Sequence, residues 1–449
     1  MAEHANNKTV QRLTAPDSED RQRRAAGSFA AHGLHAGDRV VLVVPPSANL
    51  LSVVLGALRT GVVPVLLNPT LLAHERALLI EDADPAMVVG DARVMEELLD
   101  GAPVELAPAP LARPMHYTSG TTGRPKGVWS GVLDDAQAEE LVREEAVLWG
   151  FREDDVHLVC APMHHSAPVR FAAGTLLAGG EVIVLPRFDA AAVAEAIVRH
   201  RPTTTFMAPA HLQRLLAAFD QLGSVPDLSS FRLLAHAGSP CPEPLKHRVM
   251  AAFPTGSVWE FYGSTEGQFT ACSPEDWTDN RGTVGRARPG RVMTADADGT
   301  LWCETPPHAR FSYWRDAERT AAAWRGNAFS VGDIGRIDDA GFVHLDGRRD
   351  DLIITGGVNV YPVEVEQALA GFPGVTQVAV FGVTDDRWGM RLCAAVAGDV
   401  DLEALAAYGR TRLAAYKCPK DIIAVPVIPH TENGKVRRSS LGADLGLEA

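Results

Sequence analysis

Residues 117–128 read Tyr117-Thr118-Ser119-Gly120-Thr121-Thr122-Gly123-Arg124-Pro125-Lys126-Gly127-Val128. The glycines let backbone N–H groups turn toward an anion and approach it closely. The hydroxyl groups can donate hydrogen bonds to phosphate oxygens, and Arg124 and Lys126 supply positive charge. The stretch therefore predicts a loop that holds the phosphates of a nucleotide, although a solvated linker has a similar composition.

This loop is not the P-loop of kinases and GTPases. That motif requires Gly-x-x-x-x-Gly-Lys followed by Ser or Thr. Here Gly123 is followed by Arg124 and Pro125, and Lys126 is followed by glycine. The missing pattern argues against a P-loop kinase or GTPase.

Length and composition indicate a globular protein with more than one domain. The chain has 449 residues, of which 46% are apolar and 22% charged. Its formal net charge of -14 argues against a nucleic-acid or membrane partner. The polar N-terminus has no apolar signal-peptide core, and the six cysteines show no Cys-x-x-Cys spacing. We expect a cytoplasmic monomer or homodimer with reduced cysteines.

Short apolar runs alternate with helical patterns from about Val40 to Tyr262. This alternation is typical of a parallel sheet with crossover helices, whose site lies at the carboxyl ends of the strands. Short strands and turns replace it from Gly282 to Asp346. We predict an α/β protein with two domains. Residues 1–349 form a large N-terminal α/β domain of stacked sheets plus a β-rich subdomain, and residues 350–449 form a small mobile α+β C-terminal domain.

Individual elements can be predicted within this frame. Residues before about Asp17 are expected to be disordered, and a helix is expected over Arg21–His32. The periodicity also predicts a helix over Ala190–His200 and a strand over Leu233–His236.

Two polar segments follow predicted strands. Ala161–Ser166 contains His164 and His165, whose rings either gate a pocket or form an ordinary pair in a loop. Trp259–Gly267 is either a plain strand end with a polar turn or a ligand site. In the second case Tyr262 offers a flat face for a base, Gly263 leaves room against the backbone, Thr265 contacts a phosphate and Glu266 is an oxygen ligand for Mg²⁺.

Three further segments are weaker signals when each is taken alone. Asp333, set between glycines, could accept hydrogen bonds from ribose hydroxyls, but Asp and Gly are also common turn residues. The charged break Gly347–Asp351 is followed by the glycine pair of Thr355–Pro362. In Pro429–Arg438, Lys435 could swing into the phosphate site, although an exposed basic turn is the commoner situation.

Taken together, these segments resemble the adenylate-forming superfamily, which includes acyl-CoA synthetases, adenylation domains and luciferases. The resemblance rests on their order and approximate spacing and covers nearly the whole chain from Arg21 onward. Met163–Pro168, Glu260–Gly267 and Ile353–Pro362 look most like the acyl-CoA synthetases that act on fatty, alicyclic or aryl acids. The aspartate that amino-acid adenylation domains usually carry near Ser166 is absent, which argues against an amino-acid substrate.

The resemblance implies that a small carboxylic acid is activated with ATP and Mg²⁺ and then joined to coenzyme A. Lys435 matches the lysine that bridges the carboxylate and the α-phosphate, and Thr265 and Glu266 match the phosphate and magnesium ligands. His165 matches the gate between the acid pocket and the thiol channel, and Asp350 matches the hinge of the C-terminal domain. The remaining matches are the phosphate loop (Thr118, Ser119, Gly120, Thr121, Thr122, Gly123, Lys126), the adenine pocket (Ala237, Gly238, Ser239, Tyr262), the ribose contacts (Asp333, Arg348) and the thiol-channel loop (Gly356, Gly357), with Gly263 as a further cofactor-binding residue.

The sequence departs from the family pattern in two places. The segment before the phosphate loop is shorter than usual, and Phe261 stands where many relatives have a smaller residue. A phenyl ring there could shorten or redirect the acid pocket. In addition, Arg170 either pairs with a second carboxylate on the substrate or is a surface or inter-helix arginine, which is the commoner situation.

Two other functions remain open from the sequence. The first is an acyl-AMP ligase that loads the phosphopantetheine of a carrier protein. The second is a nucleotide-binding regulator without turnover, which intact Lys435, Glu266 and Asp333 argue against.

Overall fold

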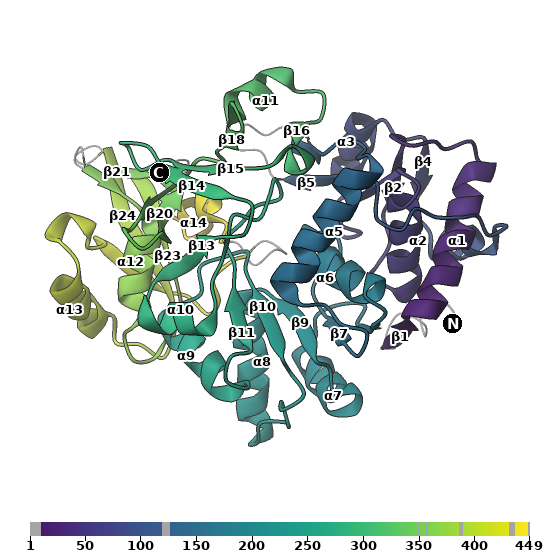
Figure 1. The fold of residues 1–449 in the computed structure, drawn as a ribbon. Helices are drawn as coiled ribbons and strands as arrows, with labels where there is room; N and C mark the ends of the chain where they lie inside the picture. The colour runs from purple at the N-terminus through teal and green to yellow at the C-terminus, as the bar shows by residue number, and fades with distance from the viewer. Residues whose placement is uncertain are drawn as a thin grey trace.

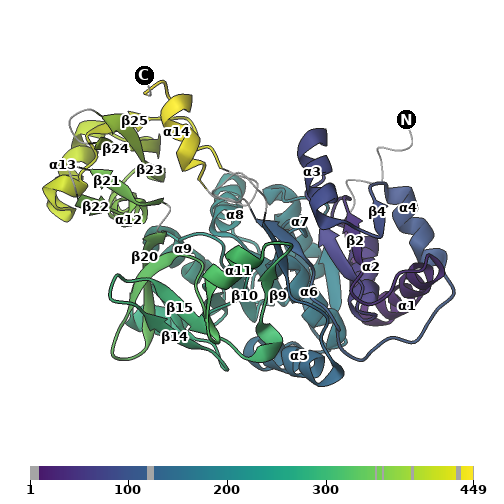
Figure 2. The same ribbon diagram turned by 90° about the horizontal axis from the view of Figure 1, so that it is seen from above.

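The computed structural model describes residues 10–118, 126–348, 351–355, 358–385, 389–430 and 436–447. It confirms the α/β class, with several stacked sheets and a separate C-terminal body. Figure 1 follows the chain from the purple N-terminal helices to the yellow C-terminal end, and Figure 2 shows from above that the C-terminal body lies beside the rest. Within these ranges, we find no helix with the length and apolarity needed to cross a membrane.

The N-terminal unit is a three-stranded parallel sheet with helices packed on it. The strand order is β3-β2-β4. Ser47 caps the first turn of α2, and Gly56 in that helix lets α1 approach so closely that a Cβ would lie 2.5 Å from the Gln22 carbonyl oxygen. The elements are α1 (Ala15–Ala31), β2 (Arg39–Leu42), α2 (Ala48–Leu58), β3 (Val63–Leu66), α3 (Ala73–Ala83), β4 (Met87–Val89) and α4 (Ala92–Glu97).

The central unit is a six-stranded sheet with the order β1-β8-β7-β9-β10-β11. All its neighbouring strands are parallel except β1, which runs antiparallel to β8. The elements are β1 (Gln11–Thr14), α5 (Asp135–Trp149), β7 (Val156–Val159), α6 (Ser166–Leu177), β8 (Glu181–Val184), α7 (Ala190–His200), β9 (Thr204–Met207), α8 (Pro209–Leu222), β10 (Leu233–His236), α9 (Glu243–Ala252) and β11 (Val258–Glu260).

The N-terminal segment corrects one expectation. Residues before Asp17 were expected to be disordered, but Gln11–Thr14 forms β1 and α1 begins at Ala15. The cause is a long-range pairing, because Gln11 lies opposite Val184 and Thr14 opposite Glu181. The side chain of Thr14 then accepts a hydrogen bond from the backbone N–H of Asp17 and starts α1.

Antiparallel sheets form the β-rich part, which was predicted from Gly282 to Asp346 and also takes in β5, β6 and β12 from earlier in the chain. Two four-stranded sheets have the orders β12-β13-β20-β19 and β14-β15-β18-β17, and a three-stranded sheet has the order β16-β6-β5. The elements are β5 (His116–Thr118), β6 (Lys126–Trp129), β12 (Thr270–Ala271), α10 (Pro274–Asp279), β13 (Thr283–Ala287), β14 (Val292–Ala295), β15 (Leu301–Glu304), β16 (Ser312–Tyr313), α11 (Ala317–Ala323), β17 (Trp324–Arg325), β18 (Ala328–Phe329), β19 (Asp333–Ile337) and β20 (Phe342–Arg348).

The C-terminal body is a sheet with the order β22-β21-β24-β23, in which β25 also pairs with β24. Its contact with α8 runs through Gln213, whose Nε2 donates to the Thr376 carbonyl oxygen at 2.6 Å and whose Oε1 accepts from Gln377 at 3.4 Å. The domain boundary near residue 350 stays a prediction. The elements are β21 (Ile353–Thr355), β22 (Val358–Val360), α12 (Pro362–Ala370), β23 (Val375–Asp385), β24 (Gly389–Gly398), α13 (Leu402–Arg412), β25 (Asp421–Ala424) and α14 (Arg438–Asp444).

Two buried histidines couple the stability of this fold to pH. His116 in β5 is 4% exposed and His157 in β7 is 1% exposed. Burial lowers the pKa of His116 to about 4 and that of His157 to about 3, against an ordinary value of 6.5. Both rings are therefore neutral in the folded protein at neutral pH.

The free energy of unfolding should fall as the pH is lowered from about 6.5 to about 4. In that window the unfolded histidines bind protons that the folded ones exclude, so stability present above pH 6.5 is lost below it. Urea denaturation at a series of pH values measures the effect. His157→Gln should flatten the curve, whereas replacement of the exposed His35 by Gln should not, and equal slopes in all three proteins would contradict this account.

Candidate active site

The predicted phosphate loop connects two paired strands. In the β5–β6 hairpin Thr118 lies opposite Lys126, so the two residues that flank the loop are neighbours. The loop residues between them, 119–125, lie outside the described ranges. Strand β16 pairs on the other side of β6, with Tyr313 opposite Val128. A side chain at Gly127 would place its Cβ 2.4 Å from the Met115 Cε. Met115, just before β5, pairs with Val65 of β3 and donates its N–H to the Pro64 carbonyl oxygen at 2.9 Å, so the hairpin is attached to the N-terminal unit.

Glu266 is held next to this hairpin by a tyrosine that the sequence did not single out. The Tyr313 hydroxyl donates to Oε1 of Glu266 at 2.8 Å, and each residue is 6% exposed. The Lys126 Nζ lies 5.6 Å from the centroid of the Tyr313 ring. Tyr313 therefore connects the phosphate hairpin to the predicted magnesium ligand.

The donor set around Glu266 suits a magnesium ion that is shared with a nucleotide. Among the described residues, the carboxylate of Glu266 accepts a hydrogen bond through Oε1 and none through Oε2. The described part of the chain contains no group of three His, Cys, Asp or Glu side chains that could hold a metal by itself. Magnesium in nucleotide sites is typically bound through one or two carboxylates plus phosphate oxygens, and Glu266 fits that arrangement.

A tight turn presents Glu266 and Thr265. Gly263 bridges to Gln268, and the N–H of Ser264 donates to the Gly267 carbonyl oxygen at 2.8 Å. A Cβ at Gly263 would lie 2.7 Å from the Gly267 oxygen, so the turn requires glycine at this position. The backbone N–H of Glu266 also donates to the Ser264 hydroxyl at 3.2 Å.

A second tyrosine joins the predicted adenine and ribose contacts. The Tyr262 hydroxyl donates to Oδ2 of Asp333 at 2.6 Å, and the two residues are 8% and 6% exposed. Asp333 lies opposite Arg348 in the β19–β20 pair, although the Arg348 side chain lies outside the described residues. Two residues predicted separately from the sequence thus share one hydrogen bond.

The other predicted adenine contacts follow the neighbouring strand. Ala237, Gly238 and Ser239 come directly after β10, which is parallel to β11. Gly238 has a φ of +97°, a backbone conformation that favours glycine. The carboxyl ends of β10 and β11 therefore carry both parts of the predicted adenine pocket, as expected for an open parallel sheet.

The histidine pair lies between β7 and α6. The rings of His164 and His165 have their centroids 4.3 Å apart, and His165 immediately precedes the first residue of α6. His116 of β5 is bonded through Nδ1 to the His164 carbonyl oxygen at 3.0 Å. The predicted gate is thereby attached to the phosphate hairpin.

Several predicted residues fall outside the described ranges. The structure nevertheless locates two of the segments that contain them, because Thr355 pairs with Val358 around the glycine pair, and His430 pairs with Val436 around the segment that carries the predicted catalytic lysine. The residues outside the ranges are Ser119, Gly120, Thr121, Thr122, Gly123, Asp350, Gly356, Gly357 and Lys435. The side chain of Thr118 is likewise not described.

A buried polar network beneath the adenine-side strands was missed by sequence reasoning. Nζ of Lys246 on α9 lies 2.5 Å from Nε2 of His236 and donates to Glu260 at 3.1 Å. Burial holds the pKa of His236 well below its ordinary value, so the ring is neutral and can accept from the lysine. The network braces α9 against β10 and β11. Lys246 is 1% exposed, and a single sequence does not show that a particular lysine is buried.

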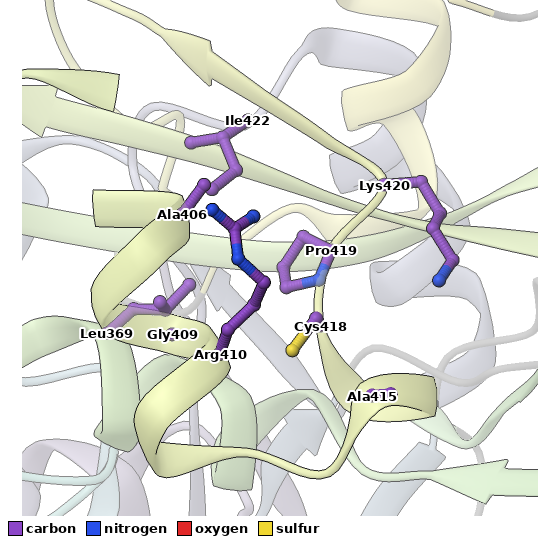
Figure 3. Close-up of a pocket in the computed structure, with 9 residues that line it drawn as sticks. All are labelled: Leu369, Ala406, Gly409, Arg410, Ala415, Cys418, Pro419, Lys420 and Ile422. Carbon is purple, nitrogen blue, oxygen red and sulfur yellow. The ribbon is translucent and has the colours of Figure 1, made fainter. Parts of the chain in front are cut away.

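An aromatic cluster surrounds Phe261. Its ring centroid lies 5.6 Å from that of Trp149, 6.2 Å from that of Phe171 and 5.8 Å from that of Phe206. Phe261 is 7% exposed, so its ring fills space next to the strand end that leads into Tyr262. A separate cavity lies in the C-terminal body between α12, α13 and Ala415–Ile422, and no predicted site residue in the described ranges lines it (Figure 3).

Comparison with known proteins agrees with this geometry. The chain matches the model of the AMP-binding enzyme family over residues 2–304 and that of the AMP-binding enzyme C-terminal domain over residues 364–435. It is 31% identical over 479 aligned positions to the long-chain-fatty-acid–CoA ligase FadD13 of Mycobacterium tuberculosis, covering 96% of this chain and 92% of that protein. It is 32% identical over 478 positions to a feruloyl-CoA synthase of an Amycolatopsis species, covering 97% and 94%.

Among solved structures, o-succinylbenzoate CoA synthetase (MenE) of Bacillus subtilis, in complex with its acyl-adenylate intermediate, superposes with a TM-score of 0.81. The identity is 27%, over 95% of this chain and 92% of that chain. The chain therefore belongs to the AMP-binding enzyme family, within the acid–CoA ligase branch of the adenylate-forming superfamily. The resemblance inferred from the sequence is confirmed, and ligases of this branch use ATP, Mg²⁺ and coenzyme A.

Replacement of Tyr313 by Phe should raise the Mg²⁺ concentration that half-saturates the enzyme by about tenfold, since a hydrogen bond to a carboxylate contributes about 1.5–3 kcal/mol. The variant removes one oxygen atom and keeps the buried ring. Magnesium titration of the ATP–pyrophosphate exchange rate measures the change. Tyr416→Phe, at an exposed ring, is the control, and an unaltered magnesium dependence in Tyr313→Phe would show that the bond to Glu266 does not matter for the metal.

Proposed function

We propose that this enzyme activates a carboxylic acid to an acyl adenylate and then transfers the acyl group to the thiol of coenzyme A. The observation that supports this most directly is the convergence of Lys126, Tyr313 and Glu266 beside the phosphate hairpin. The Tyr262–Asp333 hydrogen bond adds a second polar point at the carboxyl ends of the central strands. Relatives named for long-chain fatty acids, ferulate and 2-succinylbenzoate support the general reaction.

In the first half-reaction a carboxylate oxygen attacks the α-phosphorus of ATP, the bond to the bridging oxygen breaks, and pyrophosphate leaves. Positioning and charge stabilisation supply most of the catalysis in such a step. We assign the leaving phosphates to the 118–126 loop and Thr265, and the adenosine to Ala237–Ser239, Tyr262 and Asp333. Glu266 would hold Mg²⁺, which neutralises phosphate charge when it is bound. Lys435 would bridge the carboxylate and the α-phosphate.

In the second half-reaction the thiol sulfur attacks the acyl carbon, the bond to the AMP oxygen breaks, and the thiol proton is released to solvent. We assign the gate to His165 and the thiol channel to Gly356 and Gly357. Rotation of the C-terminal domain about Asp350 would withdraw Lys435 and bring the glycine pair to the site. The cytoplasmic location and the monomeric or dimeric state stay predictions.

Acid-dependent ATP–pyrophosphate exchange tests the first half-reaction. A panel of fatty, alicyclic and aryl acids should contain at least one that supports exchange. Lys435→Ala should lower the rate about 100- to 1,000-fold, the usual effect of removing one preorganised donor at a developing charge. Lys417→Ala removes a partly exposed ion pair with Glu364 and should leave the rate unchanged. Wild-type protein without exchange on any acid would favour a nucleotide-binding regulator.

The acceptor is tested separately, with the best acid of the panel. The enzyme is incubated with ATP and that acid in the presence of either free CoA or a holo carrier protein. We expect acyl-CoA to form, with AMP released in equal amount. Loading of the carrier without any acyl-CoA would assign the enzyme to the carrier-loading ligases and overturn the CoA assignment.

A further inference from the structure

A cluster of buried charges lies between α5, α6 and the β-rich part. We call it the arginine cluster. Its carboxylates are Glu144 and Glu145 of α5, and its cations lie on four separate segments of the chain. The described members are Glu144, Glu145, Arg113, Arg170, Arg288, Arg291 and His308. Three guanidinium groups, those of Arg170, Arg288 and Arg291, contact the two carboxylates, and Arg113 lies nearby, so the described cluster carries an excess of positive charge.

The carboxylates of the cluster are taken by other partners. Glu144 accepts from Arg291 at 3.0 Å and is bonded to His308 at 2.8 Å. Glu145 accepts from Arg288 at 2.7 Å. Each carboxylate therefore already has a close cationic partner before Arg170 is considered.

Arg170 is the member of the cluster without a hydrogen bond to any described residue. Its closest charge contact is between Nε and Oε2 of Glu145 at 3.6 Å, too long for a hydrogen bond, and both atoms are buried without another partner. A guanidinium has five N–H donors in a planar fork. Burial and the like charge of Arg288 lower the pKa of Arg170, while Glu145 raises it. An arginine serving only to neutralise Glu145 would be expected to close this gap.

The guanidinium lies beside Phe261, which the family resemblance places at the acid pocket. Its central carbon lies 5.2 Å from the centroid of the Phe261 ring and 5.6 Å from that of Phe171. Phe261 directly precedes Tyr262, and the helix that carries Arg170 begins directly after His165. The side chain of Arg170 is 26% exposed, so part of it faces solvent.

We propose that Arg170 forms a subsite for a second carboxylate on the substrate, so that the enzyme acts on acids that carry a carboxylate at each end. This inference rests on the proposed function. A carboxylate can accept two parallel N–H···O bonds from a guanidinium, and it would balance the excess cation of the cluster.

Matched pairs of acids test the subsite in the wild-type enzyme. Succinate is compared with butyrate, adipate with hexanoate, and terephthalate with benzoate, using kcat/KM of acid-dependent ATP–pyrophosphate exchange. For the pair that fits the site, the diacid should exceed its partner by about 10- to 100-fold, the usual range for charge-assisted hydrogen bonds. A preference for the monoacid in every active pair would overturn the inference and leave the proposed function standing.

The Arg170→Met variant should remove that preference, chiefly through a higher KM for the diacid, with the monoacid rate retained. Arg170→Lys should restore part of the preference, because it keeps the charge but not the planar fork. Two controls separate this from instability. Arg291→Met removes another buried cation of the cluster, and Arg143→Met removes an exposed one on α5; both should keep the wild-type acid preference.

The outcomes are distinguishable. Exchange with no acid of any kind would overturn the proposed function, and the subsite with it. Exchange in which the preference for the diacid is unchanged in a folded Arg170→Met variant would overturn the subsite alone. If thermal melting shows that Arg170→Met does not fold, Arg170→Lys and the wild-type comparison decide the question by the same criteria.

Discussion

Two buried carboxylates of the site, Glu266 and Asp333, each depend on a tyrosine hydroxyl for a short hydrogen bond. A carboxylate removed from water without a partner costs several kcal/mol, so these bonds constrain where the surrounding strands can lie. Tyr313 fixes β16, and with it the phosphate hairpin, against the turn that follows β11. Tyr262 fixes the end of β11 against β19. Groups carried by three different sheets are thereby brought to one place.

Much of the fold was predictable because its signals are local. The helix Ala190–His200 and the strand Leu233–His236 have the bounds that their residue patterns predict. These patterns of apolar and polar residues lie within the segment and do not depend on distant parts of the chain. Strand β1 could not be found this way. Gln11–Thr14 has little apolar character, and it is a strand because it pairs with the edge of the sheet at β8. The β5–β6 pairing was likewise hidden by a composition typical of loops.

The residues of the site likewise fall into those that a local motif indicates and those that depend on a distant partner. The order of short motifs pointed to Tyr262, Glu266 and Asp333, which the structure brings into the same region. Tyr313 and Lys246 were missed, because what makes each matter is a partner far away in sequence or a burial that one sequence does not display. Arg170 was noticed, but sequence alone could not show that the nearby carboxylates are already occupied.

The contact between Gln213 and the C-terminal body is one of the contacts that the rotation proposed above would have to break. It consists of hydrogen bonds between uncharged groups, worth about 0.5–1.5 kcal/mol each, and water can replace both partners. Breaking this contact would therefore add little to the free-energy difference between two orientations of the C-terminal body. As far as this contact is concerned, bound ATP or coenzyme A would need only a modest difference in affinity to favour one orientation over the other.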